Sequence, residues 1–132
     1  MSWSDTYLLH EDTIDSHHLK LIGAMKELED KQSLSKIEFL EKITFLVDYA
    51  AYHFDYEETL MKQKNYPLYE VHKKLHTVFM DKINGWIEGF NNLPPIVNYD
   101  DVSEVFQFGV AWLNRHILTV DKKFVEFLNQ QN

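Results

Sequence analysis

Five histidines and two carboxylates, placed at helical spacings in four separate segments, constrain the fold of this chain more than any other feature. They form three pairs and one single residue, namely His53 with Glu57, His72 with His76, His116 with Asp121, and His18 alone. Imidazole and carboxylate ligands without a thiolate suit non-haem iron, and zinc, manganese and copper are also compatible with them. One site large enough for two ions requires all four segments to converge.

Apolar residues recur at three- and four-residue steps in each of these segments, which is the pattern of a helix with one buried face. The expected helices begin near Asp12 or Thr13, near residue 36, near Pro67 and near residue 101, and they end near residues 30, 64, 89 and 128. We therefore predict an all-α fold, an antiparallel up-down four-helix bundle, in a single domain that spans residues 1–132.

The segments outside these helices differ in their expected structure. Residues 1–13 lack a sustained helical period, and we expect them to form an extended N-terminal arm that packs over the bundle. Asp12 or Thr13 is the expected cap of the first helix. The segment NNLPPIVNYD, residues 91–100, is expected to be one long loop before the last helix.

Composition excludes several classes of protein. The chain has no cysteine, which excludes disulfides, iron–sulfur clusters and thiol chemistry. The formal net charge of −8 argues against nucleic acid as a partner, because phosphate binding needs a basic surface. The start of the chain lacks the pattern of a signal peptide, and no apolar run approaches the roughly 20 residues of a membrane span. We expect a cytoplasmic protein that binds neither nucleic acid nor membrane.

The spacing of the candidate ligands predicts their geometry. Residues four apart stand on one helix face, so His53 can act with Glu57, and His72 with His76. His116 and Asp121 are five apart, which is about 140° around a regular helix. Both can reach one centre only if the helix contains a π-type turn, a feature that often marks functional sites. We predict such a turn between them.

Two neighbouring histidines compete for the ligand position on the first helix. At about 100° per residue, His18 lies roughly 30° from the mean direction of the apolar residues and His17 roughly 70° to the other side. We choose His18 and interpret His17 as a flanking group, either on the surface or beside a ligand. His10 falls in the predicted arm.

A single histidine is more often structural or exposed than a ligand, so the prediction depends on the joint pattern. HKKLH alone is weak, and it lacks the glutamate of the zinc-protease motif HEXXH. Five of the seven histidines, however, fall on inner helix faces with two carboxylates beside them. Acidic runs such as DYEE are expected to be solvated, apart from Glu57.

The order of these motifs resembles the hemerythrin family, specifically its single-domain bacterial members. The shared pattern is a lone histidine, then HxxxE, HxxxH and HxxxxD, together with W-S-D-x-Y, I-D-x-x-H, HF-x-x-EE-x-x-M and W-L-x-x-HI. One departure is His17, where the bacterial pattern usually has glutamine. The resemblance covers essentially the whole chain and implies an oxygen-binding di-iron site in a four-helix bundle.

The resemblance also implies a role for each ligand. Three histidines (His72, His76 and His116) would hold one iron, and His18 and His53 would hold the other. Glu57 and Asp121 would bridge the irons together with an oxo or hydroxo group. Two octahedral irons offer about twelve positions, of which these groups fill about eleven, so one position on the iron with two histidines stays open for dioxygen.

Reversible binding of dioxygen needs a dry pocket. Four residues near the ligands in sequence are expected to line it, namely Leu21, Trp112, Leu113 and Ile117. The leading hypothesis is an oxygen carrier, store or delivery protein and not an enzyme, because oxygenases of the ferritin type use carboxylates with E-x-x-H motifs. Alternatives are a sensor or interaction module, an enzyme that reacts with peroxide or nitric oxide, and a protein that handles iron. No docking surface for a protein partner is evident, which is compatible with a monomer.

Overall fold

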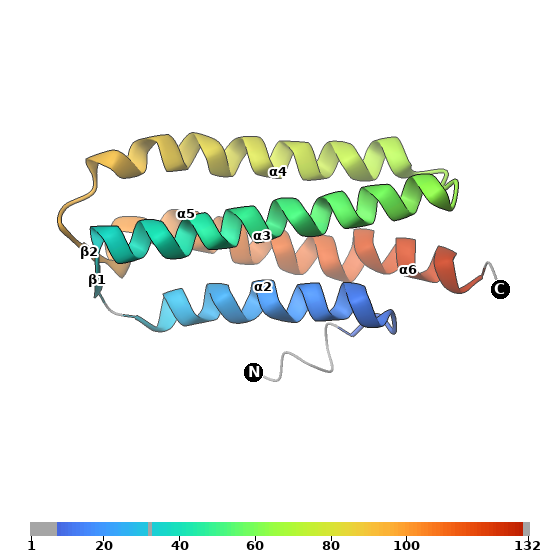
Figure 1. The fold of residues 1–132 in the computed structure, drawn as a ribbon, viewed down its shortest axis with the longest axis horizontal. Coiled ribbons are helices and arrows are strands. Elements are labelled where there is room, and N and C mark those ends of the chain that lie inside the picture. Colours follow the sequence, from blue (N-terminus) through green and yellow to red (C-terminus); the bar gives the residue numbers. More distant parts are fainter. Residues whose placement is uncertain (1–7, 32, 131–132) are drawn as a thin grey trace.

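Four helical segments lie side by side and run in alternating directions in this computed structural model, which describes residues 8–31 and 33–130 (Figure 1). They are α2 (Asp12–Asp30), α3 (Lys36–Gln63), α4 (Tyr69–Gly89) and a fourth segment made of α5 (Tyr99–Arg115), η2 (His116–Asp121) and α6 (Lys122–Asn129). The prediction of an antiparallel up-down four-helix bundle is confirmed. Among the described residues, no helix is both long and apolar enough to cross a membrane.

The start of α2 differs from the sequence prediction. Its cap is Glu11, whose Oε2 accepts a hydrogen bond of 2.6 Å from the backbone N–H of Ile14. Asp12 and Thr13, the predicted caps, instead lie in the first turn, where the Asp12 carboxylate faces the positive end of the helix dipole. The prediction missed this cap because glutamate is not among the preferred capping residues.

The segment before α2 is held by a buried carboxylate. Asp15 accepts hydrogen bonds from the backbone N–H groups of Leu9 at 2.8 Å and His10 at 3.1 Å. Leu9 is buried in the core, and His10 adopts a positive φ of 69°. The predicted arm therefore ends at Glu11, and its residues 1–7 lie outside the described part of the chain.

A short antiparallel pair of strands connects the α2–α3 loop to the α4–α5 loop at one end of the bundle (Figure 1). β1 (Ser33–Ser35) pairs with β2 (Ile96–Asn98), and Leu34 stands opposite Val97. β2 lies inside the segment predicted to be one loop, which also contains part of the 3-10 turn η1 (Phe90–Asn92). The expectation that residues 91–100 form one long loop is therefore wrong, since the segment also contains β2 and the first residues of α5. Strands of three residues are too short to show an alternating pattern in the sequence.

Two hydrophobic clusters fill the bundle. One lies at the end with β1 and β2 and contains Phe39, Phe90, Val97 and Phe106, and the other contains Ile14, Phe54, Met61 and Phe124. The second cluster also contains Leu21, Leu113 and Ile117, which precede or follow candidate ligands in the sequence. The candidate ligands therefore lie in the apolar interior.

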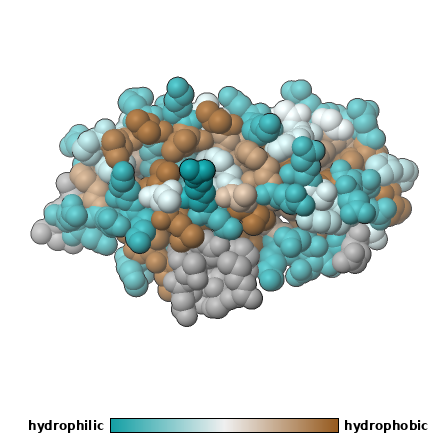
Figure 2. All heavy atoms as spheres, turned by 180° about the vertical axis from the view of Figure 1, so that it is seen from behind, coloured by the Kyte–Doolittle hydropathy of each residue, from teal (hydrophilic) through white to brown (hydrophobic). Residues whose placement is uncertain are grey.

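The outer surface mixes side chains of both kinds. Figure 2 shows hydrophobic residues interspersed with hydrophilic ones over one face of the bundle. Large exposed apolar side chains occur on several elements, for example Ile37 on α3, Val71 on α4 and Ile96 on β2. Scattered exposure of this kind is normal for a folded domain and needs no partner to explain it.

Candidate metal centre

All seven candidate ligands point into the bundle, and each is at most 3% exposed. Their ligand atoms form two groups, each within 4.8 Å. One group is Glu57, His72, His76, His116 and Asp121, and the other is His18, His53, Glu57 and Asp121. The two carboxylates belong to both groups. Four helical segments thus bring residues that are up to about a hundred positions apart in the chain to one buried place.

The last segment reaches this place through a change of helix type. Residues His116–Asp121 form a π-helix between α5 and α6. The wider turn brings residues five apart onto one side, so that His116 Nε2 lies 3.1 Å from Asp121 Oδ1. The predicted π-type turn is confirmed.

The two carboxylates contact imidazoles from different helices. Asp121 Oδ2 lies 3.0 Å from His18 Nε2, and Asp121 Oδ1 lies 3.0 Å from His72 Nε2. Glu57 Oε1 lies 3.5 Å from His53 Nε2 and 3.3 Å from His76 Nε2. Each carboxylate therefore links a histidine of one group to a histidine of the other.

Several of these buried atoms lack a hydrogen-bond partner among the described residues. They include His18 Nδ1, His53 Nε2 and both oxygens of Glu57. An unsatisfied buried polar group costs roughly 1–3 kcal/mol, so a cluster of them needs another partner. A cation between the imidazole and carboxylate lone pairs would supply it. The chemistry of the donor set and these unpaired atoms fit two bound metal ions.

The two buried carboxylates differ in the direction of their pKa shifts, because their neighbours differ. Burial, together with the nearby charge of Asp121, raises the pKa of Glu57 well above its usual range. Burial would also raise the pKa of Asp121, but His116 and hydrogen bonds from His116, His18 and His72 hold it well below its usual range. Burial likewise lowers the pKa of His53 well below 6.5. Without metal, the cluster thus favours a neutral Glu57, a neutral His53 and an ionised Asp121.

Acidification is expected to destabilise the metal-free protein through His76. Burial lowers the pKa of this residue from 6.5 to about 4, despite its hydrogen bond to Glu58. Between these values the unfolded chain binds more protons than the folded chain. The stabilising contribution is therefore fully present above about pH 6.5 and is lost as the pH falls toward 4, in total about 3 kcal/mol.

Glu57 opposes this trend, because its raised pKa gives a contribution that is present below 4.5 and is lost as the pH rises. Urea unfolding of the metal-free wild type and the Glu57→Gln variant at about pH 7 and about pH 5 separates the two effects. The variant should lose more free energy of unfolding on acidification than the wild type. Equal losses would contradict the opposing role of Glu57.

Comparison of the chain with known proteins identifies its family. The profile of the family described as Hemerythrin HHE cation binding domain matches residues 10–128 of the chain. The chain belongs to the hemerythrin family. The resemblance seen in the order of the sequence motifs is therefore confirmed.

Hemerythrins of bacteria and of animals are similar to the chain over most of its length. A bacteriohemerythrin of Clostridium acetobutylicum is 31% identical, with 94% of this chain and 98% of that protein covered. A myohemerythrin of Theromyzon tessulatum is 30% identical, with 92% and 88% covered. The crystal structure of a wild-type hemerythrin superposes with a TM-score of 0.78 at 26% identity, with 96% and 95% covered.

Two residues of this hemerythrin centre were missed by sequence reasoning. Glu58, expected to be solvated, accepts a hydrogen bond of 2.9 Å from Nδ1 of His76. Phe54 stacks on the same imidazole, with ring centroids 3.9 Å apart and an interplanar angle of 11°. Phe54 could have been found, because it continues the inner helix face between Ala50 and Met61. Glu58 gave no such signal, since it lies beside that face.

His17 is also part of the centre. It is 6% exposed, and its Nδ1 lies 2.8 Å from Nδ1 of His53. Burial lowers its pKa, as does the neighbouring His18. Of the two interpretations made for this residue, the surface position is wrong and the position beside a ligand is confirmed.

The four residues expected to line a dry pocket occupy different places. Leu21 and Leu113 line an apolar cavity of about 70 Å³ that also reaches Phe54. Trp112 stacks on His116, with ring centroids 4.3 Å apart, and Ile117 is fully buried in the surrounding core. The structure thus brings two of the four to this cavity, whereas Trp112 packs against a ligand and Ile117 lies in the core cluster.

Proposed function

We propose that this chain holds two iron ions in the buried cluster and binds dioxygen there reversibly, as a carrier, store or delivery protein and not as a catalyst. The observation that carries the proposal is the pair of ligand groups that share Glu57 and Asp121. It is supported by membership of a family whose relatives are named bacteriohemerythrin and myohemerythrin.

The proposed division of ligands follows these groups. Three histidines, His72, His76 and His116, would hold one iron, and His18 and His53 would hold the other. Glu57 and Asp121 would bridge the two, together with an oxo or hydroxo group. When bound, the iron pair supplies one electron from each ion to dioxygen. The iron with two histidines has fewer protein ligands and is the side on which dioxygen would bind.

The surrounding side chains keep this place dry. The apolar cavity is lined by Leu21, Phe54 and Leu113, among other apolar residues, and Phe54 connects it to the centre by stacking on His76. Water needs two to four polar partners to be held in a buried cavity, whereas dioxygen needs none. An apolar lining therefore admits dioxygen while it limits the supply of water and protons that would leave both irons oxidised.

Replacement of Leu113 by asparagine is expected to speed autoxidation. The new amide would hold water beside the centre, and one hydrogen bond of about 1 kcal/mol corresponds to about a fivefold change in rate. The measurement is the decay of the oxygenated absorption band in air. Leu118→Asn is the control, because Leu118 lies on the same helical segment, in η2, but is 36% exposed. Equal rates in both variants would count against the role of Leu113.

One experiment tests the proposed function as a whole. The iron-loaded protein is reduced without air, air is then admitted, and the visible spectrum is followed together with the iron content. Reversible coloration with two irons per chain supports the proposal. Immediate irreversible oxidation with consumption of added peroxide would instead indicate a di-iron enzyme, and tight binding of zinc with no uptake of iron would contradict both.

A further inference from the structure

His17 makes a contact that the set of seven ligands does not explain. It follows Ser16 on α2, beside the candidate ligand His18, and its side chain reaches α3. Its Nδ1 lies 2.8 Å from Nδ1 of His53, and the two rings stand at 87° to each other. One buried imidazole is thus hydrogen-bonded to the back of another that faces the metal centre.

The position of the proton in this bond follows from the other end of His53. Its Nε2 lies inside the ligand cluster, 3.5 Å from Glu57 Oε1, and has no hydrogen-bond partner among the described residues. A metal can bind Nε2 only through its lone pair, so the proton of a neutral His53 must be on Nδ1. His53 is therefore the donor in the bond, and His17 Nδ1 accepts.

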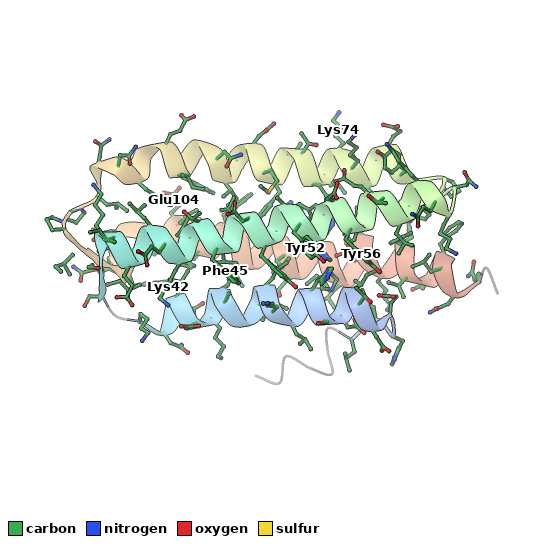
Figure 3. All side chains as sticks on the ribbon, in the orientation of Figure 1. Lys42, Phe45, Tyr52, Tyr56, Lys74 and Glu104 are labelled. Carbon is green, nitrogen blue, oxygen red and sulfur yellow. The ribbon has the colours of Figure 1, made fainter. Side chains whose placement is uncertain are left out.

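Aromatic rings hold His17 in the orientation that this bond needs. Three tyrosines of α3 contact its imidazole, with centroid distances of 5.8 Å for Tyr49, 5.4 Å for Tyr52 and 5.1 Å for Tyr56. Figure 3 shows Tyr52 and Tyr56 between α3 and α2. The rings restrict rotation of the imidazole and so keep its Nδ1 aimed at His53.

The two ligand groups differ in the residue that accepts a hydrogen bond from the Nδ1 of a ligand histidine. His76, in the three-histidine group, is hydrogen-bonded through Nδ1 to the Glu58 carboxylate at 2.9 Å. His53, in the two-histidine group, is bonded to an imidazole, which must be uncharged when its Nδ1 accepts. A charged acceptor strengthens a metal-bound imidazole as a donor more than a neutral acceptor does. The two metal positions are therefore electronically unequal.

We propose that His17 is a positioning residue, which fixes His53 as the Nδ1–H tautomer, aims its Nε2 at the metal and sets the donor strength of the two-histidine position. This inference rests on the proposed function, because it assigns a metal to His53. The bacterial pattern usually has glutamine at the position of His17. Glutamine and histidine can both accept a hydrogen bond, so either side chain could fill this role.

The tautomers can be measured in the unmodified protein. Zinc-loaded protein with nitrogen-15-labelled histidine is diamagnetic, and long-range proton–nitrogen spectra distinguish a protonated ring nitrogen from a bare one. We expect His53 to be protonated at Nδ1 and His17 at Nε2. Protonation of His17 at Nδ1, with a bare Nδ1 on His53, would overturn the proposal without any variant.

Two substitutions test the consequence for the metal. His17→Leu removes the acceptor and is expected to weaken binding at the two-histidine position by roughly 10–100-fold and to make its iron potential more positive. His17→Gln keeps an acceptor and should restore most of both values. Ser16→Leu is the control, because it places the same new side chain on α2 directly before His17 but at an exposed position.

The outcomes separate this inference from the proposed function. If His17→Leu retains wild-type affinity and potential while the chain still binds two irons and dioxygen, the role of His17 is wrong and the function stands. If the wild type holds no pair of metal ions, the proposed function itself fails. Circular dichroism shows whether His17→Leu still folds, and the tautomer measurement decides the question if it does not.

Discussion

Replacement of Asp121 by alanine is expected to leave the chain unable to hold a pair of iron ions. Its Oδ1 lies 3.0 Å from His72 and 3.1 Å from His116, and its Oδ2 lies 3.0 Å from His18. No other single change would withdraw a ligand from both groups and also remove the one carboxylate that is ionised without metal. The iron content should fall from two ions per chain to one or none.

The same substitution is expected to abolish the oxygenated absorption band, since a single iron cannot supply two electrons from two adjacent ions. Iron content by elemental analysis and the spectrum after exposure to air are the measurements. Glu126→Ala is the matched control, because Glu126 is an exposed carboxylate on α6, five residues further along. Two irons and a normal spectrum in Asp121→Ala would show that the pair is not bridged by this residue.

Removal of the metal is expected to produce the largest change in stability. The buried polar atoms without partners become an uncompensated cost when no cation is bound. At a free metal concentration a thousand times Kd, binding adds about 4 kcal/mol to the free energy of unfolding. For a chain of this length that corresponds to a rise of about 15 °C in Tm.

Differential scanning calorimetry of the loaded and chelator-treated protein at neutral pH measures this difference. The gap should widen as free metal is added, because the stabilisation follows the logarithm of its concentration. The Asp121→Ala variant provides a second comparison, since chelator should change its Tm much less. A Tm that is the same with and without metal would mean that the cluster is already satisfied by the protein alone.

The helices and the faces that they bury could be predicted, because both follow from the periodic spacing of apolar residues. From the apolar spacing, the ends of the four helical segments were predicted to within a few residues. The same spacing predicted that the candidate ligands lie on inner helix faces. The five-residue gap between His116 and Asp121 was informative for the opposite reason. It disagreed with a regular helix, and the disagreement indicated a π-type turn.

Features that depend on one contact between distant residues could not be predicted. The pairing of Leu34 with Val97 depends on which links meet at one end of the bundle, and three residues carry no period. Glu58 lies just off the inner face, so hydropathy assigns it to the surface, and for His17 the sequence left open a surface position or a position beside a ligand. Only the packing of α2 on α3, and of α4 on α3, brings each behind a ligand.

The π-helix lets the last segment carry one residue more than a regular helix would hold over the same length. Deletion of one residue between His116 and Asp121 would leave the two four apart in a regular helix, still on a common side. Phe124 and Val125, which are at most 1% exposed, would then keep their direction relative to α5 and stay in the core. Deletion of one residue elsewhere in α5 would instead turn everything beyond it by about 100°. A one-residue deletion is therefore tolerated within this stretch, whereas the same deletion in the regular helix beside it would carry apolar side chains toward water.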